Sequence, residues 1–182
     1  GDGSSSKWSS DRISQIRSYL EKQYPTAAFA GKLEADKQNG FVNKEQVLDF
    51  FDTWPQVELH KTNFDSFFCN NADVIGSKFD NPKALKSDLK KIQRIFRLAP
   101  DYETTKSLID KNITSSHSVY ALGKKRFAAA MSDKLSKEDA DKIYKKAERS
   151  YAASLAIIGE FKSLQNGSAL NVLPDVYEAY EE

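Results

Sequence analysis

The sequence contains few of the residues that build metal and disulfide sites. Its 182 residues include one cysteine, Cys69, and two histidines, His60 and His117. A single cysteine excludes an internal disulfide framework and a multi-cysteine zinc site, and two histidines supply few ligands for a metal cluster. We therefore expect no metal and no other cofactor.

The sequence also lacks an excess of charge of one sign, because 27 Lys and Arg side chains are balanced by 26 Asp and Glu side chains. A net charge of +1 lacks the cationic excess on which general binding to nucleic acids or membrane surfaces depends. No apolar run approaches the roughly 20 residues of a membrane span, and no charged-then-apolar signal segment opens the chain. With 40% hydrophobic and 29% charged residues, the composition predicts a compact globular protein of one domain or two small ones.

Apolar residues recur at helical spacing along most of the chain, and no segment alternates over six residues as a strand would. The sequence therefore predicts an all-α fold, an irregular bundle of about seven to nine helices. The last helix is the longest, because Ser136 and Asp139 form a capping box and a continuous apolar face follows them. A helix from Ser136 to Leu164 would be about 43 Å long. Its predicted apolar face comprises Ala140, Ile143, Tyr144, Ala147, Tyr151, Leu155 and Ile158.

Shifts in composition divide the chain into five parts. Residues 1–9 are rich in Gly and Ser and are expected to form a flexible leader. A helical subdomain is expected over 10–70 and a second one over 82–170, separated by a polar surface loop over 71–81. An acidic tail covers 171–182.

Local signals mark several helix starts within these parts. Asn43 with Gln46 forms a second capping box, and Asn81 precedes Pro82 as a cap precedes a first-turn proline. Ile13, Ile16, Leu20 and Tyr24 are expected on one face of the first helix. The core is expected to contain Phe50, Phe51, Trp54, Ile92, Phe96, Ile143, Tyr144 and Tyr151.

A turn at Asn39-Gly40 resembles the centre of a calcium-binding EF-hand loop. Alignment on Gly40 places Ala35 and Lys37 at the first and third ligand positions and Gln46 at the last, where calcium needs carboxylates. A lysine in the ring would repel the ion. We therefore interpret this segment as a turn between helices.

The candidate nucleophiles also lack support from their surroundings. Cys69 has no adjacent base and is expected to be a buried structural thiol. The hydroxyl groups beside His117, such as that of Ser115, are expected to cap a helix, since no nucleophile elbow is present. The sequence thus predicts no catalytic residue, and we expect the protein not to be an enzyme.

The segment from Lys78 to Arg97 carries seven basic and two acidic residues, a local charge of +5. Such a run is usually a solvated face, or it pairs with an acidic neighbour such as the tail. No RNA-binding signature accompanies it, so we expect no nucleic-acid partner. The residues expected to bind a protein partner are Lys90, Lys91, Arg94 and Arg97.

Several short motifs occur in an order that resembles one family. Residues 92–100, IQRIFRLAP, are similar to an LQRLFRLTP-type signature, and 140–147, ADKIYKKA, are similar to an A-x-x-I-Y-x-x-A helix. Residues 29–34 and 50–59 resemble FAxxLE and FLxxNPxFDL stretches. Residues 115–127 resemble the helix that precedes the A-x-x-I-Y-x-x-A helix in the same family. Over roughly 24–175, this pattern resembles the N-terminal helical region of Tc toxin A subunits, which are large insecticidal toxin chains.

The resemblance implies a non-catalytic helical module in the shell that surrounds a translocation channel. Its implied partners are other domains of the parent chain, which assembles as a homopentamer, and a host surface receptor. It also implies a secreted or cell-surface location within a larger bacterial toxin, although this segment carries no signal peptide. The isolated piece is expected to be a monomer. A free-standing adaptor that presents a helical face to a protein partner is the alternative.

Overall fold

The computed structural model describes residues 3–37 and 43–166, with side chains described over 11–37 and 43–164. Over these residues the chain forms ten helices and no strand, which confirms the predicted all-α fold with one helix more than expected. In chain order the helices are α1 (Gly3–Gln23), α2 (Pro25–Ala35), α3 (Lys44–Thr53), α4 (Phe64–Asn70), α5 (Ala72–Lys78), α6 (Pro82–Phe96), α7 (Tyr102–Asp110), α8 (Ser116–Leu122), α9 (Lys124–Ala130) and α10 (Lys137–Asn166).

Two segments differ from the prediction. The expected loop at 71–81 contains α5, which forms because Ile75 and Phe79 are buried in the core. Tertiary burial here outweighs a sequence too short and polar to show a helical period. The expected flexible leader at 1–9 is helical from Gly3 onward. Once the apolar part of α1 has nucleated, each further residue adds one hydrogen bond, so the helix extends through a polar segment.

The predicted caps fall into two groups. The Asn81 side chain accepts a hydrogen bond from the Ala84 amide at 3.0 Å, and the Ser136 hydroxyl accepts one from the Asp139 amide at 3.0 Å. The capping box predicted at Asn43 is wrong, because Asn43 has a left-handed backbone with φ 65° and forms no side-chain cap. Its amide instead donates to the Asp88 carboxylate at 2.8 Å, which ties the start of α3 to α6.

The buried residues form two clusters that share helix α6. The first joins α2–α6 and contains most of the aromatic side chains, and the second joins the end of α6 to α7–α10. Ile92 and Phe96 face the first cluster and Ile95 faces the second. Of the predicted core residues only Trp54 and Tyr151 are half-buried, and the other six are buried. The two clusters therefore share α6 as a common wall.

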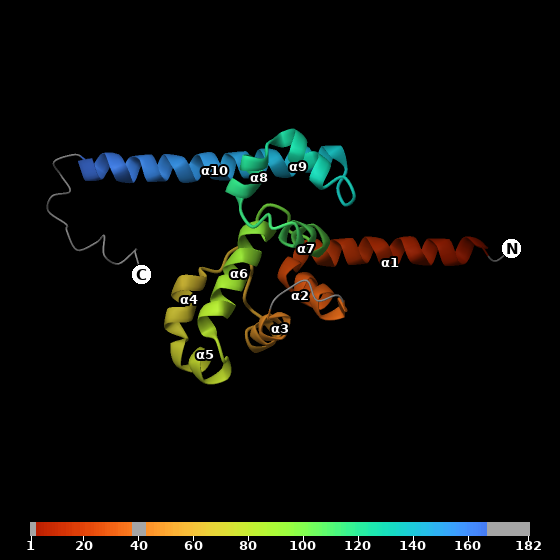
Figure 1. The fold of residues 1–182 in the computed structure, drawn as a ribbon. Coiled ribbons are helices and arrows are strands. Elements are labelled where there is room, and N and C mark those ends of the chain that lie inside the picture. Colours follow the sequence, from red (N-terminus) through yellow and green to blue (C-terminus); the bar gives the residue numbers. More distant parts are fainter. Residues whose placement is uncertain (1–2, 38–42, 167–182) are drawn as a thin grey trace.

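Helices α1 and α10 extend beyond this body on opposite sides (Figure 1). Only the first part of α10 packs on the body, where it contacts α8 and α9 (Figure 1). Its predicted apolar face is buried at Ala140, Ile143, Tyr144 and Ala147. From Ala152 to Leu164 every residue is exposed.

Candidate interaction surfaces

Three lysines of α6 have partners within the chain. Lys90 and Lys86 both form ion pairs with Asp65 on α4, each at 2.8 Å. Lys91 lies 3.5 Å from Asp88, one turn away on the same helix. Hydrogen bonds from Lys86 and Lys90 hold the pKa of the Asp65 carboxyl below its usual range. Lys86 and Lys90 therefore connect α6 to α4.

The two arginines of the predicted binding set connect α6 to neighbouring loops. Arg94 Nε donates to the Thr114 carbonyl at 3.4 Å, and Arg97 Nε donates to the His60 carbonyl at 3.1 Å. Each predicted partner-binding residue thus has an intramolecular contact. Their role in binding another protein stays a prediction.

Removal of both lysines, Lys86→Ala with Lys90→Ala, is expected to raise the pKa of Asp65 toward that of an unpaired aspartate. The ordinary value is about 3.9. Both hydrogen bonds that favour the charged carboxylate are lost, so it protonates at a higher pH. NMR titration of the Asp65 carboxyl carbon measures the shift. Lys83→Ala, an exposed site on the same helix, is the control, and an equal shift there would contradict the assignment.

The candidate catalytic residues are dispersed. Cys69 is exposed, contrary to its predicted burial, because α4 buries Phe64 and Phe68 and the next residue points away from that face. The Ser115 hydroxyl caps α8 by accepting from the Ser118 amide at 3.1 Å, as predicted. The His117 ring packs against Tyr151 with centroids 4.9 Å apart. Among the described residues, no three His, Cys, Asp or Glu side chains are placed to hold a metal ion.

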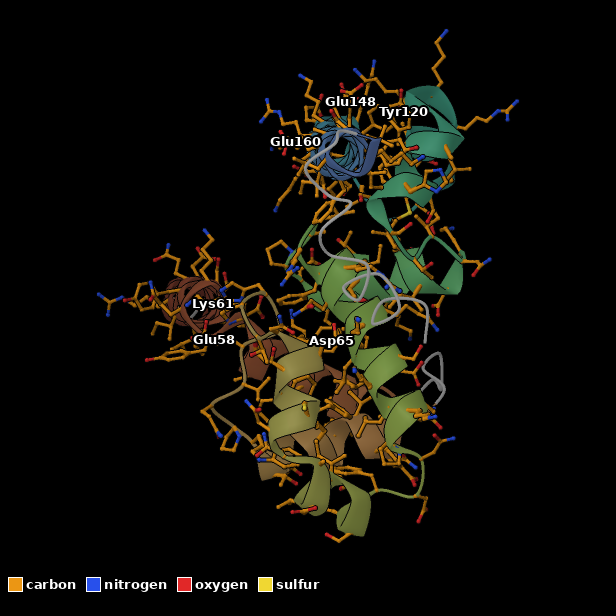
Figure 2. The ribbon with its side chains drawn as sticks, turned by 90° about the vertical axis from the view of Figure 1, so that its left-hand side faces the viewer. Glu58, Lys61, Asp65, Tyr120, Glu148 and Glu160 are labelled. Carbon is orange, nitrogen blue, oxygen red and sulfur yellow. The ribbon has the colours of Figure 1, made fainter. Side chains whose placement is uncertain are left out.

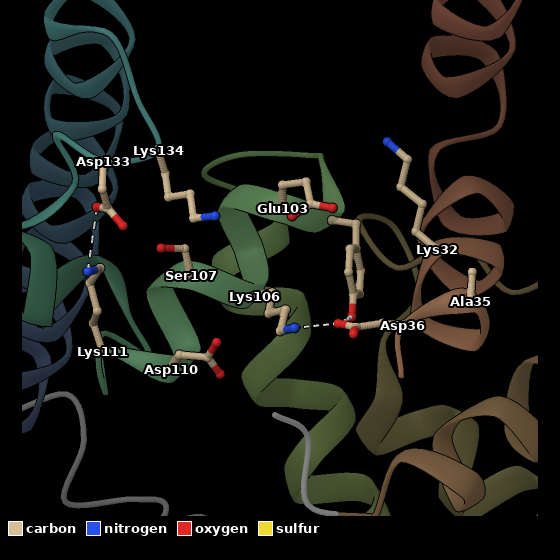
Figure 3. A pocket seen from close by; sticks show the side chains of 11 residues that line it. Lys32, Ala35, Asp36, Glu103, Lys106, Ser107, Asp110, Lys111, Asp133 and Lys134 are labelled. Atoms are coloured by element: carbon tan, nitrogen blue, oxygen red, sulfur yellow. Dashed lines mark hydrogen bonds and ion pairs between the residues drawn. The ribbon is translucent and has the colours of Figure 1, made fainter. Parts of the chain in front are cut away.

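A charged cleft of about 620 Å³ lies between α2, α7 and the turn before α10 (Figure 3). Asp36 stands at one side of it and accepts a hydrogen bond from Tyr102 Oη at 2.6 Å. It also forms an ion pair with Lys106, and both side chains are only 15% exposed. Four lysines and four acidic residues line the cleft, so its charges balance: Lys32, Lys106, Lys111, Lys134, Asp36, Glu103, Asp110 and Asp133. The contacts of Asp36 with Tyr102 and Lys106 join the end of α2 to α7.

Burial, followed by the hydrogen bond to Asp36, raises the pKa of Tyr102. A tyrosine that binds its proton more tightly when folded stabilises the fold below its unfolded pKa of about 10, and this stability falls as the pH rises above 10. Wild type is therefore expected to lose up to about 1.4 kcal/mol more per pH unit above pH 10 than Tyr102→Phe. Urea unfolding between pH 9 and 11 measures the difference, and equal slopes for both proteins would contradict it.

The exposed apolar residues gather on the two projecting helices. On α1, Ile16 is 58% exposed and Leu20 is 48% exposed. Together with α2 this helix forms an apolar groove of about 680 Å³. The predicted apolar face of α1 is therefore exposed, since nothing among the described residues covers it. The exposed members on α1 are Ile13, Ile16, Tyr19 and Leu20, and Tyr24, between α1 and α2, is exposed as well.

The outer half of α10 presents a second such surface. Tyr120 of α8 stacks on Tyr144 and packs on Tyr151, and it lies beside α10, which is seen end-on in Figure 2. Beyond this contact the helix extends away from the body (Figure 1). Residues 150–159, SYAASLAIIG, carry no charge. No described helix is long and apolar enough to cross a membrane. Large apolar side chains exposed here are Leu155, Ile157, Ile158, Phe161 and Leu164.

Helical periodicity identifies both apolar faces, but it does not show whether other parts of the same chain cover them.

No family matches the sequence, and neither the curated proteins nor the solved structures contain a match. The class of protein that the geometry defines is a helical bundle in which no other described residue covers the apolar residues of α1 and of the outer half of α10.

Proposed function

We propose that this chain is a non-catalytic helical module that acts through contact with other protein surfaces. The observation that carries the proposal is the exposure of nine large apolar side chains, four on α1 and five on the outer half of α10. Soluble proteins rarely leave contiguous apolar patches uncovered unless these form interaction sites. Residues 150–159 have no charge on any side, a pattern typical of a helix enclosed by others.

The larger protein that we propose is a Tc-type toxin A subunit. There the module would contribute to the shell around the translocation channel and to contacts with other domains or a host surface, in a secreted or cell-surface assembly. The support is the order of the motifs over 24–175. Their hydrophobic positions fit this role, since Phe29, Phe50 and Phe96 lie in the first cluster and Ile143 and Ala147 in the second.

A free-standing adaptor is the second candidate. The same exposed faces favour it, because an adaptor also presents uncovered apolar helices to a partner. The two candidates differ in the size of the gene product and in the identity of the covering surface.

An antibody raised against this chain distinguishes them on a blot of the source organism. A band of several hundred kilodaltons supports the toxin module. A band at the size of the 182-residue chain would refute the toxin assignment and leave the adaptor. Hydrogen exchange of residues 152–164 in the native product then tests the contact role. Protection is expected there, and fast exchange in the native product would overturn it.

A further inference from the structure

Helices α2 and α3 pack side by side (Figure 1), and a groove of about 480 Å³ lies between them. Its lining is apolar at the half-buried Leu48 and at the buried Phe51 and Val57. Three of its α2 residues are small and leave room for the backbone of a partner: Ala27, Ala30 and Gly31. The groove therefore offers apolar contacts and space for a close approach.

Every charged side chain that lines this groove is acidic, which gives it a local charge of −4. The four residues are exposed, and none forms an ion pair with another residue that the structure describes: Glu34, Glu45, Asp49 and Asp52. Lys44, at the start of α3, donates instead to the backbone carbonyls of Glu34 and Asp36. The cleft between α2 and α7, by contrast, has as many lysines as acids. The charge of the α2–α3 groove is thus left for a partner to balance.

Two of these carboxylates stand where helix electrostatics disfavours them. Glu34 is the last residue but one of α2, and Asp52 is the last residue but one of α3. The C-terminal end of a helix carries a partial negative charge on its free carbonyls, so an acidic side chain there lowers stability. Natural proteins accept such losses at functional surfaces. An interaction with a cationic partner therefore explains both positions better than stability does.

The spacing of the α3 residues fits a second helix that lies alongside. Four residues that line the groove follow the i, i+3, i+4, i+7 pattern of one helix face: Glu45, Leu48, Asp49 and Asp52. Glu45 and Asp52 are about 10 Å apart along the helix axis, which is two turns. A partner helix repeats at the same interval. Basic side chains seven residues apart on it can therefore meet both carboxylates, while apolar side chains between them meet Leu48.

We propose that the α2–α3 groove binds a basic amphipathic helix of another protein. This helix has Lys or Arg at positions i and i+7 and apolar residues at i+3 and i+4. The carboxylates select the sign of the partner, because they attract a basic helix and repel an acidic one. The groove is a different surface from the exposed faces of α1 and the outer half of α10, so the inference goes beyond the proposed function and does not rest on it.

A synthetic alanine-based helical peptide tests the proposal on the full chain. It carries Lys at i and i+7 and Leu at i+3 and i+4, and calorimetric titration measures its Kd. The double variant Glu34→Lys with Asp52→Lys is expected to raise the Kd at least about tenfold, since two attractive contacts become repulsive. Its Tm is expected to be at least as high as that of wild type, because lysine is favourable at a helix C-terminus. Lost binding then does not come from unfolding. Glu34→Gln with Asp52→Asn is the second variant if the first does not fold.

The controls separate the groove from general electrostatics. Asp80→Lys with Glu148→Lys makes the same change in net charge at two exposed sites outside the groove, and this variant is expected to bind the peptide like wild type. A second peptide has its lysines on the side of the helix opposite the leucines. It is expected to bind wild type at least about tenfold more weakly, because its lysines and leucines cannot face the groove together.

Three results would overturn the proposal. They are a wild-type chain that does not bind the first peptide at millimolar concentrations, a charge-matched control that loses as much affinity as the groove variant, and a second peptide that binds as tightly as the first. If wild type self-associates and the groove variant does not, a second copy fills the groove and the proposed partner is refuted. Hydrogen exchange of residues 152–164 tests the proposed function separately, so the two can fail independently.

Discussion

Replacement of Phe50 by alanine is expected to lower the free energy of unfolding by about 3–5 kcal/mol. Phe50 is fully buried in the first cluster, where its ring lies among other aromatic rings. The centroid of the Trp54 ring is 5.0 Å from that of Phe50. The substitution removes the ring's burial and leaves a cavity that several rigid rings cannot fill. Its other ring neighbours are Phe51, Phe64, Phe67, Phe68 and Phe79.

Urea unfolding followed by circular dichroism measures this loss. Val74→Ala on α5 serves as a control, because Val74 is exposed and an exposed substitution usually changes stability by about 0.5 kcal/mol or less. If Phe50→Ala and Val74→Ala had equal midpoints, the aromatic cluster could not be the core of this half of the fold.

Most of the fold could be predicted because its signals are local. The Asn81-Pro82 start, the Ser115 cap and the Ser136 cap each depend on residues within one helical turn, and the structure has all three. Helix α5 could not be predicted, because Ile75 and Phe79 show no period long enough to recognise and are fixed by contacts with other helices. The same applies to Asn43, whose side chain bonds to Asp88 45 residues away.

The candidate surfaces were harder to predict. Periodicity identified the stripes that contain Ile16 and Ile158, but the same stripe buries Ala147 and exposes Ile158 within one helix. Whether an apolar face is covered depends on which helices the chain brings to it. Here α8 and α9 pack on the first part of α10 and do not extend along its outer half (Figure 1). The basic residues were found by charge alone, and Asp65, which pairs with two of them, lies outside the run.

Asp36 shows how one polar residue that no pattern indicated can join two parts of the fold. Its carboxylate pairs with Lys106 and accepts from Tyr102, both on α7, while its backbone follows the end of α2. Lys44, at the start of α3, donates to its backbone carbonyl. Three helices therefore meet at this residue. Its side-chain contacts can be removed without loss of the backbone ones.

Asp36→Ala is expected to destabilise the fold by about 3–5 kcal/mol, because it leaves the Lys106 ammonium largely buried without its counter-charge. Lys106→Met alone leaves the Asp36 carboxylate with its Tyr102 hydrogen bond. In the Lys106→Met background, the further change Asp36→Ala is expected to cost clearly less than in wild type, since no unpaired cation remains. Urea unfolding of the four proteins at neutral pH gives the coupling energy. If the two substitutions were additive, Asp36 and Lys106 would act independently, and the loss would belong to the Tyr102 hydrogen bond alone.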